Sequence, residues 1–579
     1  MNALRASAFL LSLLVACSAA GPAPEVVSPE PSAERPTRVP IAEPKKPASP
    51  RGDDRFAIAA ENATAVEAAR EILEDGGSAV DAAIVTVLVG CAAHPASCGL
   101  GGGGAALFFD AQTKKTEYLD FREAAPSGIK NADYLSKNPP EKRRGVMVGV
   151  PGLVAGLAEL HARGGKLPFA TVVGAAADAV ERGIPLSAYM AQVLEWNRKW
   201  LKADPRAAAL WPADAEGRVG ETLKNPALVK ALRSIAAGGK DAFYSGALGT
   251  DVVTTARDAQ SRVLMKDLKE YRVVSRAPLE VEWEGRKLVT APPPSGAGLV
   301  VAELFHSFSA PDLKQLDAAT GSYVHMIAEG LRAGYSDRAL FVGDPEFFKT
   351  EISATLEPAR LRARRAKFRP DATIMPKLSS ISDAGTFHCV VVDADGDVVS
   401  LSASLSSMFG AKLVTESGFV LNDALSEFTI DEYGQRPVSR GPNFARGGAR
   451  PVSNLVPTLV FEGGAPVVAL GGSGGLRATS AVAIVLFAHL AFGVPLPDAV
   501  AKPRFHVTSA GALKLDAPLQ GLKDDLVARG EVVEVGAPGF GAVTAIGLRR
   551  EGGRRTLEPV FDPRRGGAIT VGHDVPAQE

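Results

Sequence analysis

The run Thr386-Phe387-His388-Cys389-Val390-Val391-Val392 is followed by an Asp395-Gly396 pair and by a second β-rich run, Val398 to Ser404. Aromatic and β-branched residues on both sides of Asp-Gly predict a β-hairpin. A two-residue turn would place Thr386 opposite Leu405. Ser404 would then lie one place away and face the other side of the sheet, unless a bulge intervenes.

The residues after this hairpin predict a second one. Leu455 to Phe461 and Pro466 to Leu470 flank Gly463-Gly464, and an apolar helix is expected from Arg477 to Phe492. Hairpins beside buried helices are typical of an α+β protein in which antiparallel sheets and helices form layers.

Upstream of the hairpins the sequence predicts mainly helices. One begins at Asn62, and Ser78 opens a second, almost wholly apolar helix with a capping-box pattern. A helix that is apolar all round is expected to be buried. Ala105 to Phe109 reads as a strand, and residues 150–380 read as mostly helical.

The composition limits the kind of partner. The chain has 579 residues, 46% of them hydrophobic, with 64 basic and 65 acidic residues. A net charge of -1 gives no field that attracts nucleic acid, so a small-molecule partner is expected instead. The eight histidines are scattered, and no Cys-x-x-Cys or His-Glu-x-x-His spacing occurs. Neither a metal nor another cofactor is therefore expected.

The first residues have the features of an export signal. A basic start and an apolar stretch end at Leu14-Val15-Ala16-Cys17, which is similar to the lipobox of bacterial lipoproteins. The alternative is a cysteine that lies by chance near an ordinary cleavage site. Residues 1–17 are predicted to be a signal peptide that ends at a lipidated Cys17, and residues 18–52 a disordered Pro/Ala-rich tether.

These features predict export to the bacterial periplasm or cell envelope, with membrane contact only through the lipid anchor. In such a compartment Cys91 and Cys98 could form a disulfide, and the sequence leaves this open.

Two glycine-rich motifs suggest different chemistries. Gly99 to Gly104 satisfies G-x-G-x-x-G, but a helix precedes it and a strand follows, which is the reverse of a dinucleotide site. Gly471 to Gly475 satisfies G-x-S-x-G. A serine hydrolase that uses Ser473, Asp516 and His573 is therefore one alternative.

At Gly385-Thr386 a polar loop changes abruptly into a strand. If the bond before Thr386 were cut, this residue would carry a nucleophilic hydroxyl and an α-amine that serves as its general base. The reference pKa of such an amine, roughly 7.7 to 8.0, leaves an appreciable neutral fraction near neutral pH. The backbone N–H groups of Gly474 and Gly475 would then bind a developing oxyanion.

Seven blocks of sequence, in one order from about Arg55 to the end of the chain, match a known pattern. They are Ala79-Val80-Asp81-Ala82-Ala83 with Gly99-Leu100-Gly101-Gly102-Gly103; Leu119 to Pro126; Gly149-Val150-Pro151-Gly152; Thr386-Phe387-His388 with Val391-Val392-Asp393 and Gly396; Arg450-Pro451-Val452-Ser453 with Pro457-Thr458; Gly474-Gly475; and Pro503-Arg504-Phe505-His506. Together they resemble the γ-glutamyltransferase family.

This resemblance implies a four-layer αββα sandwich of the N-terminal-nucleophile hydrolase kind. It also implies a precursor that cuts itself between Gly385 and Thr386 into a large subunit, residues 53–385, and a small subunit, residues 386–579, which stay associated. The implied reaction transfers a γ-glutamyl or related acyl group to Thr386, and then to water or an acceptor amine.

The resemblance further implies roles for single residues. Ser404 would hydrogen-bond the hydroxyl of Thr386, and Gly474 and Gly475 would form the oxyanion hole. The planar guanidinium of Arg122 suits the α-carboxylate of a glutamyl donor.

The remaining donor-binding positions depart from the family pattern. Ser453 would assist Arg122, but Asn454 replaces a second serine, and the positions that match the α-amine site are Ser406, Ala424 and Glu427. These changes predict a donor other than glutathione. A non-catalytic exported lipoprotein that binds a ligand or partner is the remaining alternative.

Overall fold

The computed structural model describes residues 54–130, 135, 139–349, 351–373, 385–429, 441–536 and 540–573. The predicted signal peptide with Cys17 and the predicted tether lie outside these residues. Among the helices of the described residues, none is long and apolar enough to cross a membrane.

The first of two large sheets is antiparallel throughout and contains the predicted hairpin at its centre. Its seven strands, in spatial order, are β18 (Ala568–His573), β1 (Asp54–Ala60), β9 (Gly385–Val392), β10 (Val398–Ser406), β2 (Gly103–Asp110), β3 (Lys115–Phe121) and β6 (Val274–Arg276).

The second large sheet is also antiparallel and contains the second predicted hairpin. Its six strands, in spatial order, are β17 (Arg554–Val560), β16 (Ala542–Glu551), β12 (Ala465–Ser473), β11 (Thr458–Glu462), β8 (Arg286–Thr290) and β7 (Leu279–Trp283). The hairpin β7–β8 lies within residues 150–380, where mostly helices were expected.

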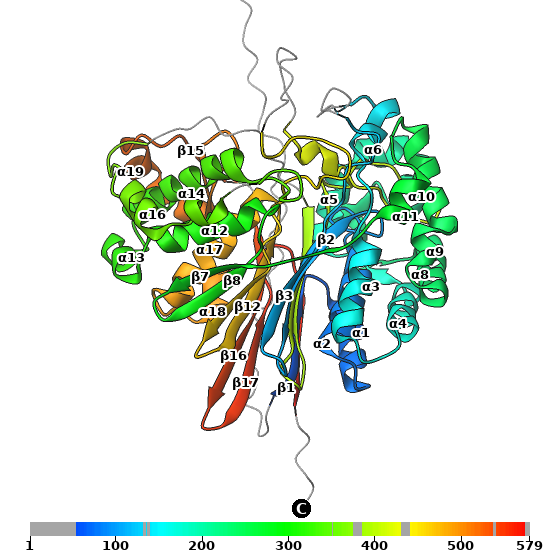
Figure 1. Ribbon diagram of the computed structural model, residues 1–579, viewed down its shortest axis with the longest axis horizontal. Helices are drawn as coiled ribbons and strands as arrows, with labels where there is room; N and C mark the ends of the chain where they lie inside the picture. Colours follow the sequence, from blue (N-terminus) through cyan, green and yellow to red (C-terminus); the bar gives the residue numbers. More distant parts are fainter. Residues whose placement is uncertain are drawn as a thin grey trace, which may run out of the picture. The chain divides into compact units, whose positions relative to one another are not determined.

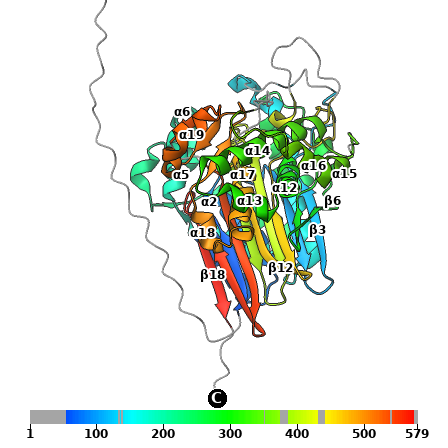
Figure 2. The ribbon, with the colours of Figure 1, turned by 90° about the vertical axis from the view of Figure 1, so that its left-hand side faces the viewer.

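Helices cover the outer faces of the two sheets, so the four layers run helix, sheet, sheet, helix (Figure 1). A core of aliphatic and aromatic side chains joins the two sheets face to face. One outer layer includes α1 (Ala63–Glu74), α2 (Ala79–Ala93), α3 (Leu153–Gly164), α4 (Phe169–Arg182) and α8 (Pro226–Gly238). The other layer includes α12 (Gly296–Ser307), α14 (Gly321–Phe341) and α17 (Leu476–Leu490), which lie in front of the strands in Figure 2.

The remaining elements are short and extend these layers. They are α5 (Ala188–Trp196), α6 (Arg198–Ala203), α7 (Pro205–Leu210), α9 (Asp241–Tyr244), α10 (Ala247–Asp258), α11 (Met265–Glu270), α13 (Ala310–Leu316), α15 (Ile352–Thr355), α16 (Pro358–Arg365), α18 (Leu496–Ala501), α19 (Lys523–Ala528), and the strands β4 (Ile184–Pro185), β5 (Thr222–Leu223), β13 (Phe505–Val507), β14 (Leu513–Leu515) and β15 (Val533–Val535).

The first two helices begin as the sequence predicts. The Asn62 side chain accepts a hydrogen bond from the Ala65 N–H, and the capping box between Ser78 and Asp81 is formed. The glycines after α2 allow close packing rather than nucleotide binding, because a Cβ on Gly101 would lie 2.2 Å from the Val420 carbonyl oxygen. The glycine motif is confirmed as the point where a helix passes into a strand.

The pairing register of β9 and β10 differs by one residue from the expected register. Val392 pairs with Val398, because the connection is a larger loop in which the Asp393 carboxylate accepts the N–H groups of Asp395, Gly396 and Asp397. The expected register, in which Thr386 pairs with Leu405, is therefore wrong along Val398 to Ala403. Ala403 pairs with Phe387 and Ser406 with Gly385, so a bulge in β10 sets both Ser404 and Leu405 against Thr386.

Candidate active site

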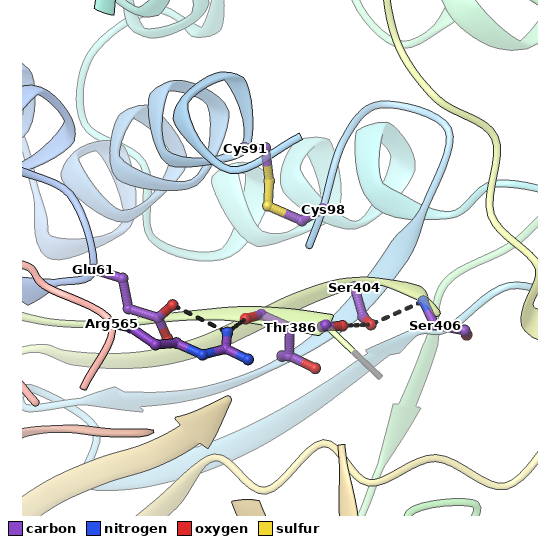
Figure 3. Close-up of a disulfide and its surroundings, with 8 residues drawn as sticks. Glu61, Cys91, Cys98, Thr386, Ser404, Ser406 and Arg565 are labelled. Carbon is purple, nitrogen blue, oxygen red and sulfur yellow. Dashed lines mark hydrogen bonds and ion pairs between the residues drawn. A yellow bond between two sulfur atoms is a disulfide. The ribbon is translucent and has the colours of Figure 1, made fainter. Parts of the chain in front are cut away.

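Thr386 is the second residue of β9, between the central strands β1 and β10, and only 5% of it is exposed. The peptide group before it is held by Ser404, whose hydroxyl donates to the Gly385 carbonyl oxygen over 2.7 Å. The same hydroxyl accepts the Ser406 N–H over 3.0 Å (Figure 3). A hydrogen-bond donor therefore lies on the carbonyl that Thr386 would have to attack in the uncut chain.

A buried ion pair lies on the other side of Thr386. The Arg565 guanidinium donates to the Thr386 carbonyl oxygen over 2.7 Å and lies 3.5 Å from the Glu61 carboxylate (Figure 3). The guanidinium carbon of Arg565 also lies over the Tyr189 ring, 5.1 Å from the ring centroid. These contacts fix the backbone of the predicted nucleophile within a dry part of the protein.

Burial and the neighbouring charges shift the pKa values of Glu61 and Arg565 in opposite directions. Burial raises the pKa of Glu61, although the Arg565 charge opposes this rise. Burial alone would lower the pKa of Arg565, but Tyr189 and Glu61 favour its charged form and the net shift is upward. The guanidinium therefore stays charged beside Thr386.

Gly474 and Gly475 form the turn between β12 and α17. Both have positive φ, +109° and +62°, which only glycine adopts without strain. A Cβ on Gly474 would lie 3.5 Å from Nη2 of Arg565, the side chain that holds Thr386. The turn thus places the positive N-terminal end of α17 beside the candidate nucleophile.

The predicted serine triad is not assembled. Ser473 is fully buried at the end of β12, and its hydroxyl lies against Glu61. Asp516 forms an ion pair with Arg564, and His573 forms one with Asp54 in the first sheet. Because each partner is engaged elsewhere, the structure does not support the serine hydrolase alternative.

Arg122 and Ser406, which were both predicted to bind the donor, are in direct contact. The Arg122 Nη2 donates to the Ser406 hydroxyl over 2.9 Å, and Nη1 donates to Glu123 over 3.0 Å. Ser406 has a φ of +73°, an uncommon conformation for a residue with a side chain. The bulge in β10 therefore turns this hydroxyl toward the guanidinium at a cost in backbone strain.

The other residues that were predicted to bind the donor are Ser453, Asn454 and Glu427, and their contacts differ. Ser453 is buried and pairs with Ser295, and among the described residues no hydrogen bond joins it to Arg122. The side-chain oxygen Oδ1 of Asn454 is buried without a hydrogen-bond partner within the described part of the chain. Glu427 lies near Arg338, whose charged form it favours.

Sequence reasoning missed Asp423 beside this site. Its carboxylate accepts the Ser407 N–H over 2.8 Å, and its charge acts on both Arg122 and Glu123. Its neighbour Asn422 ties the Gly149 motif to the site through hydrogen bonds to the Gly149 N–H and carbonyl. The pattern Asn-Asp in a loop gave no signal that distinguishes it from an ordinary turn.

Glu61 and Arg565 were also missed, because they lie 504 positions apart in sequence. The only hint was their proximity to strand ends, which many charged residues share.

The possible disulfide between Cys91 and Cys98 is formed, with an S–S distance of 2.03 Å. It closes the loop after α2, and the close-up draws the disulfide together with Thr386 and Ser404 (Figure 3). The carbonyl oxygen of Ser97 accepts the Leu405 N–H over 2.9 Å, and a Cβ on Gly385 would lie 3.1 Å from the Ser97 Cα. The loop closed by the disulfide therefore packs directly against Gly385.

Metal binding has no candidate among the described residues. No group of three or more histidine, cysteine, aspartate or glutamate side chains is placed to hold an ion there.

The chain is similar to known proteins over most of its length. A profile of the family described as Gamma-glutamyltranspeptidase matches residues 65–572. A glutathione hydrolase proenzyme of Pseudomonas aeruginosa is 32% identical over 548 residues, which cover 90% of this chain and 95% of the relative. A proenzyme of the same name from Bacillus subtilis is 27% identical, with 91% and 94% covered.

Solved structures agree with these relatives. The cephalosporin acylase of Bacillus halodurans has a TM-score of 0.77 at 22% identity, covers 92% of this chain and 99% of its own, and supports the fold. The γ-glutamyltranspeptidase of Pseudomonas nitroreducens has a TM-score of 0.50 at 28% identity, and covers 54% of this chain and 94% of its own. The four-layer αββα fold is thus confirmed, and the chain belongs to the gamma-glutamyltranspeptidase family of N-terminal-nucleophile enzymes.

Proposed function

We propose that this enzyme cuts its own chain between Gly385 and Thr386, and then uses Thr386 to hydrolyse or transfer γ-glutamyl or related acyl amides. The observation that carries the proposal is the 2.7 Å hydrogen bond from the Ser404 hydroxyl, in the bulge of β10, to the Gly385 carbonyl oxygen. The relatives named glutathione hydrolase support a γ-glutamyl amide as the donor class.

Self-cleavage follows from these groups. The Thr386 hydroxyl attacks the Gly385 carbonyl carbon, and the Ser404 hydroxyl stabilises the negative charge on the oxygen. The C–N bond then breaks to leave an ester, and the proton lost by the Thr386 hydroxyl passes to the nitrogen. Water then hydrolyses the ester. The products are a carboxylate on Gly385 and a free α-amine on Thr386, which separate the chain into residues up to 385 and residues 386–579.

Catalysis repeats this chemistry on a small molecule. The α-amine of Thr386 takes the hydroxyl proton while the oxygen attacks the amide carbonyl, and the leaving amine receives that proton. The turn at Gly474 and Gly475 supplies N–H groups for the oxyanion, and the Ser404 hydroxyl, free of Gly385, orients the nucleophile. Water or an acceptor amine then removes the acyl group.

Arg122 gives the donor its orientation. Its guanidinium suits the α-carboxylate of a glutamyl group, and Ser453 and Asn454 complete this side of the site. The negative charge of Glu427 acts on the guanidinium of Arg338. This interaction reduces the charge that Glu427 offers to a ligand.

The location of the enzyme is part of the proposal. The N-terminal sequence favours export and a lipid on Cys17, which would place the site in the periplasm or cell envelope. Cleavage of the chain would then yield the two associated subunits, residues 53–385 and 386–579.

The test compares the purified wild type with Thr386→Ala and with Ser473→Ala on a denaturing gel, followed by N-terminal sequencing. We expect the wild type and Ser473→Ala to yield a fragment that begins Thr386-Phe387-His388, and Thr386→Ala to remain whole. Incubation with a γ-glutamyl anilide should add one γ-glutamyl mass to that fragment. An uncut wild type, or activity that survives Thr386→Ala, would contradict the proposal.

A further inference from the structure

The proposed reaction needs a nitrogen that the cleavage itself creates. In the uncut chain the nitrogen of Thr386 belongs to a peptide bond and does not titrate. After cleavage it is an α-amine, and it accepts the hydroxyl proton only in its neutral form. A reference pKa of roughly 7.7 to 8.0 leaves most of such an amine protonated at pH 7. A neighbouring group that opposes this protonation would therefore make the cut enzyme faster at neutral pH.

The Arg565 guanidinium contacts the residue that carries this nitrogen. Nη1 donates to the Thr386 carbonyl oxygen over 2.7 Å, and a single Cα separates that carbonyl group from the nitrogen. Arg565 is only 5% exposed, so water and salt screen its charge weakly. Figure 3 shows the guanidinium between the Glu61 carboxylate and Thr386. The positive end of the Glu61–Arg565 pair therefore faces the predicted nucleophile.

The turn that carries Arg565 is anchored independently of Thr386. The Arg565 N–H donates to the Asp562 carbonyl oxygen over 3.4 Å, and the Asp562 carboxylate forms a buried ion pair with Arg504 at 2.6 Å. The same carboxylate accepts the Val543 N–H over 3.0 Å. The guanidinium is thus a charge at a fixed place, which is what a constant effect on a neighbouring amine requires.

Other titratable or charged groups surround Thr386 from several elements. They are His388 and Cys389 on β9, His94 in the loop closed by the disulfide, Tyr189 on α5, Arg477 on α17, and Arg122, Glu123 and Asp423 beside the bulge of β10. Burial lowers the pKa of His94 to about 4 and the pKa of His388 to about 3, so both rings are neutral at pH 7. Burial raises the pKa of the Cys389 thiol, which is therefore protonated there.

We infer that Arg565 is a positioning residue whose charge keeps the α-amine of the cut Thr386 in its neutral, proton-accepting form, while its hydrogen bond fixes the Thr386 backbone. This inference rests on the proposed function. The physical reason is that a nearby positive charge disfavours the protonated form of an amine. The charge has no such effect before cleavage, because the peptide nitrogen does not titrate. Self-cleavage therefore reports the folding of a variant separately from the effect of the charge.

The test measures kcat/KM for γ-glutamyl-p-nitroanilide against pH in purified, cut enzymes, because the acid side of this profile reports the base of the free enzyme. Arg565→Gln removes the charge and keeps an N–H donor, whereas Arg565→Lys keeps the charge. The matched control is Arg332→Gln in the other helix layer. Arg332 is also buried, is ion-paired with Glu531, and donates to a backbone carbonyl oxygen, that of Gly511, over 3.1 Å. A denaturing gel shows that each variant cuts itself.

We expect Arg565→Gln to raise the acid-side midpoint by about one pH unit, the lower end of the usual effect of one nearby charge. Arg565→Lys and Arg332→Gln should keep the wild-type midpoint. Glu61→Gln should lower the midpoint, because it removes the negative charge that balances Arg565. Shifts in opposite directions from two variants of one ion pair cannot arise from a general loss of packing.

An unchanged midpoint in both Arg565→Gln and Glu61→Gln would overturn the inference alone, whatever happens to the maximal rate. Failure of both variants to cut themselves would also overturn it, since the charge is assigned no role before cleavage. If only Arg565→Gln stays uncut, a lower midpoint in Glu61→Gln supports the inference and an unchanged one overturns it. A wild type that cuts itself but does not hydrolyse the anilide would overturn the proposed function and this inference together.

Discussion

The Ser404 hydroxyl lies on the carbonyl that must accept negative charge when the chain cuts itself. Removing one such donor typically slows a reaction by about a hundredfold or more. We expect Ser404→Ala to slow the appearance of the fragment 386–579 by about that factor, and Ser404→Thr to keep most of the rate. The measurement is a time course of purified precursor on a denaturing gel.

Ser400→Ala provides the control for this prediction. Ser400 lies on the same strand and also donates to a carbonyl, that of Leu470, over 3.0 Å, but it is remote from the cut site in register. Equal slowing in Ser400→Ala and Ser404→Ala would show that the effect is general loss of packing. Unchanged cleavage in Ser404→Ala would rule out the role given to its hydroxyl.

Some of these residues could be predicted from the sequence, and others could not. Thr386 and Arg122 lie in motifs whose order along the chain matches the family, so their proximity to the site could be expected. Glu61 and Arg565 come together only because β1 pairs with β9 and the last strands return to the same sheet. No local pattern predicts an ion pair across such a distance in sequence.

The loop between Cys91 and Cys98 supports the strand end beside the proposed cleavage position. Its carbonyl groups at Ala96 and Ser97 accept the N–H groups of Phe409 and Leu405, and so support the end of β10. A native disulfide typically contributes about 2–4 kcal/mol to the free energy of unfolding. We expect Cys91→Ser with Cys98→Ser to lose that amount and to cut itself more slowly.

Both effects of the disulfide can be measured separately. Unfolding in urea is measured in a Thr386→Ala background, where the chain stays whole, and the cleavage rate is measured with Thr386 in place. Treatment of the wild type with a thiol reductant should reproduce the slower cleavage and should not affect the double variant. A reductant effect of the same size on the double variant would refute the explanation.

His94, in the same loop, makes stability depend on pH. It is fully buried, its ring nitrogen contacts the Glu61 carbonyl oxygen, and burial with the nearby Arg565 charge lowers its pKa to about 4. The unfolded histidine has a pKa near 6.5. The native state therefore binds fewer protons than the unfolded state between these values, and stability is present above about pH 6.5 and lost as the pH falls toward 4.

The expected size of this loss is up to about 3 kcal/mol. We predict that His94→Gln, in the Thr386→Ala background, loses less free energy of unfolding between pH 7 and pH 5 than its parent. Two other buried histidines, His388 and His506, also have a pKa lowered to about 3, so the parent is the necessary comparison. Parallel pH curves for the two proteins would show that His94 has the same pKa in the native and the unfolded state.

The hairpin of β9 and β10 shows how far sequence patterns define an element. Its strands and its turn region were predicted, but the register was displaced by one residue because Asp393 organises a larger loop than a two-residue turn. The side chain of one turn residue thus accounts for the register of the pairs from Val398 to Ala403. The hairpin β7–β8 was missed for a different reason, since short alternating strands among helices give a weak periodic signal.

The two sheets combine strands from both sides of the Gly385–Thr386 bond. In the first sheet β1 lies between β18 and β9, and β10 pairs with β2. In the second sheet β11 pairs with β8. Separation of the two products would break four strand pairings and expose the buried N–H and C=O groups of each. The cut chains are therefore expected to stay together as one folded unit.

This expectation can be tested on the mature enzyme. We predict that the wild type shows two chains on a denaturing gel but elutes as one species in size-exclusion chromatography without denaturant, at the volume of uncut Thr386→Ala. Residues 386–579 expressed alone should be insoluble, because β9 and β10 would lack β1 and β2 beside them. Two native peaks, or a soluble and folded small fragment, would mean that the interleaved strands contribute less to cohesion than the separate helix and sheet layers.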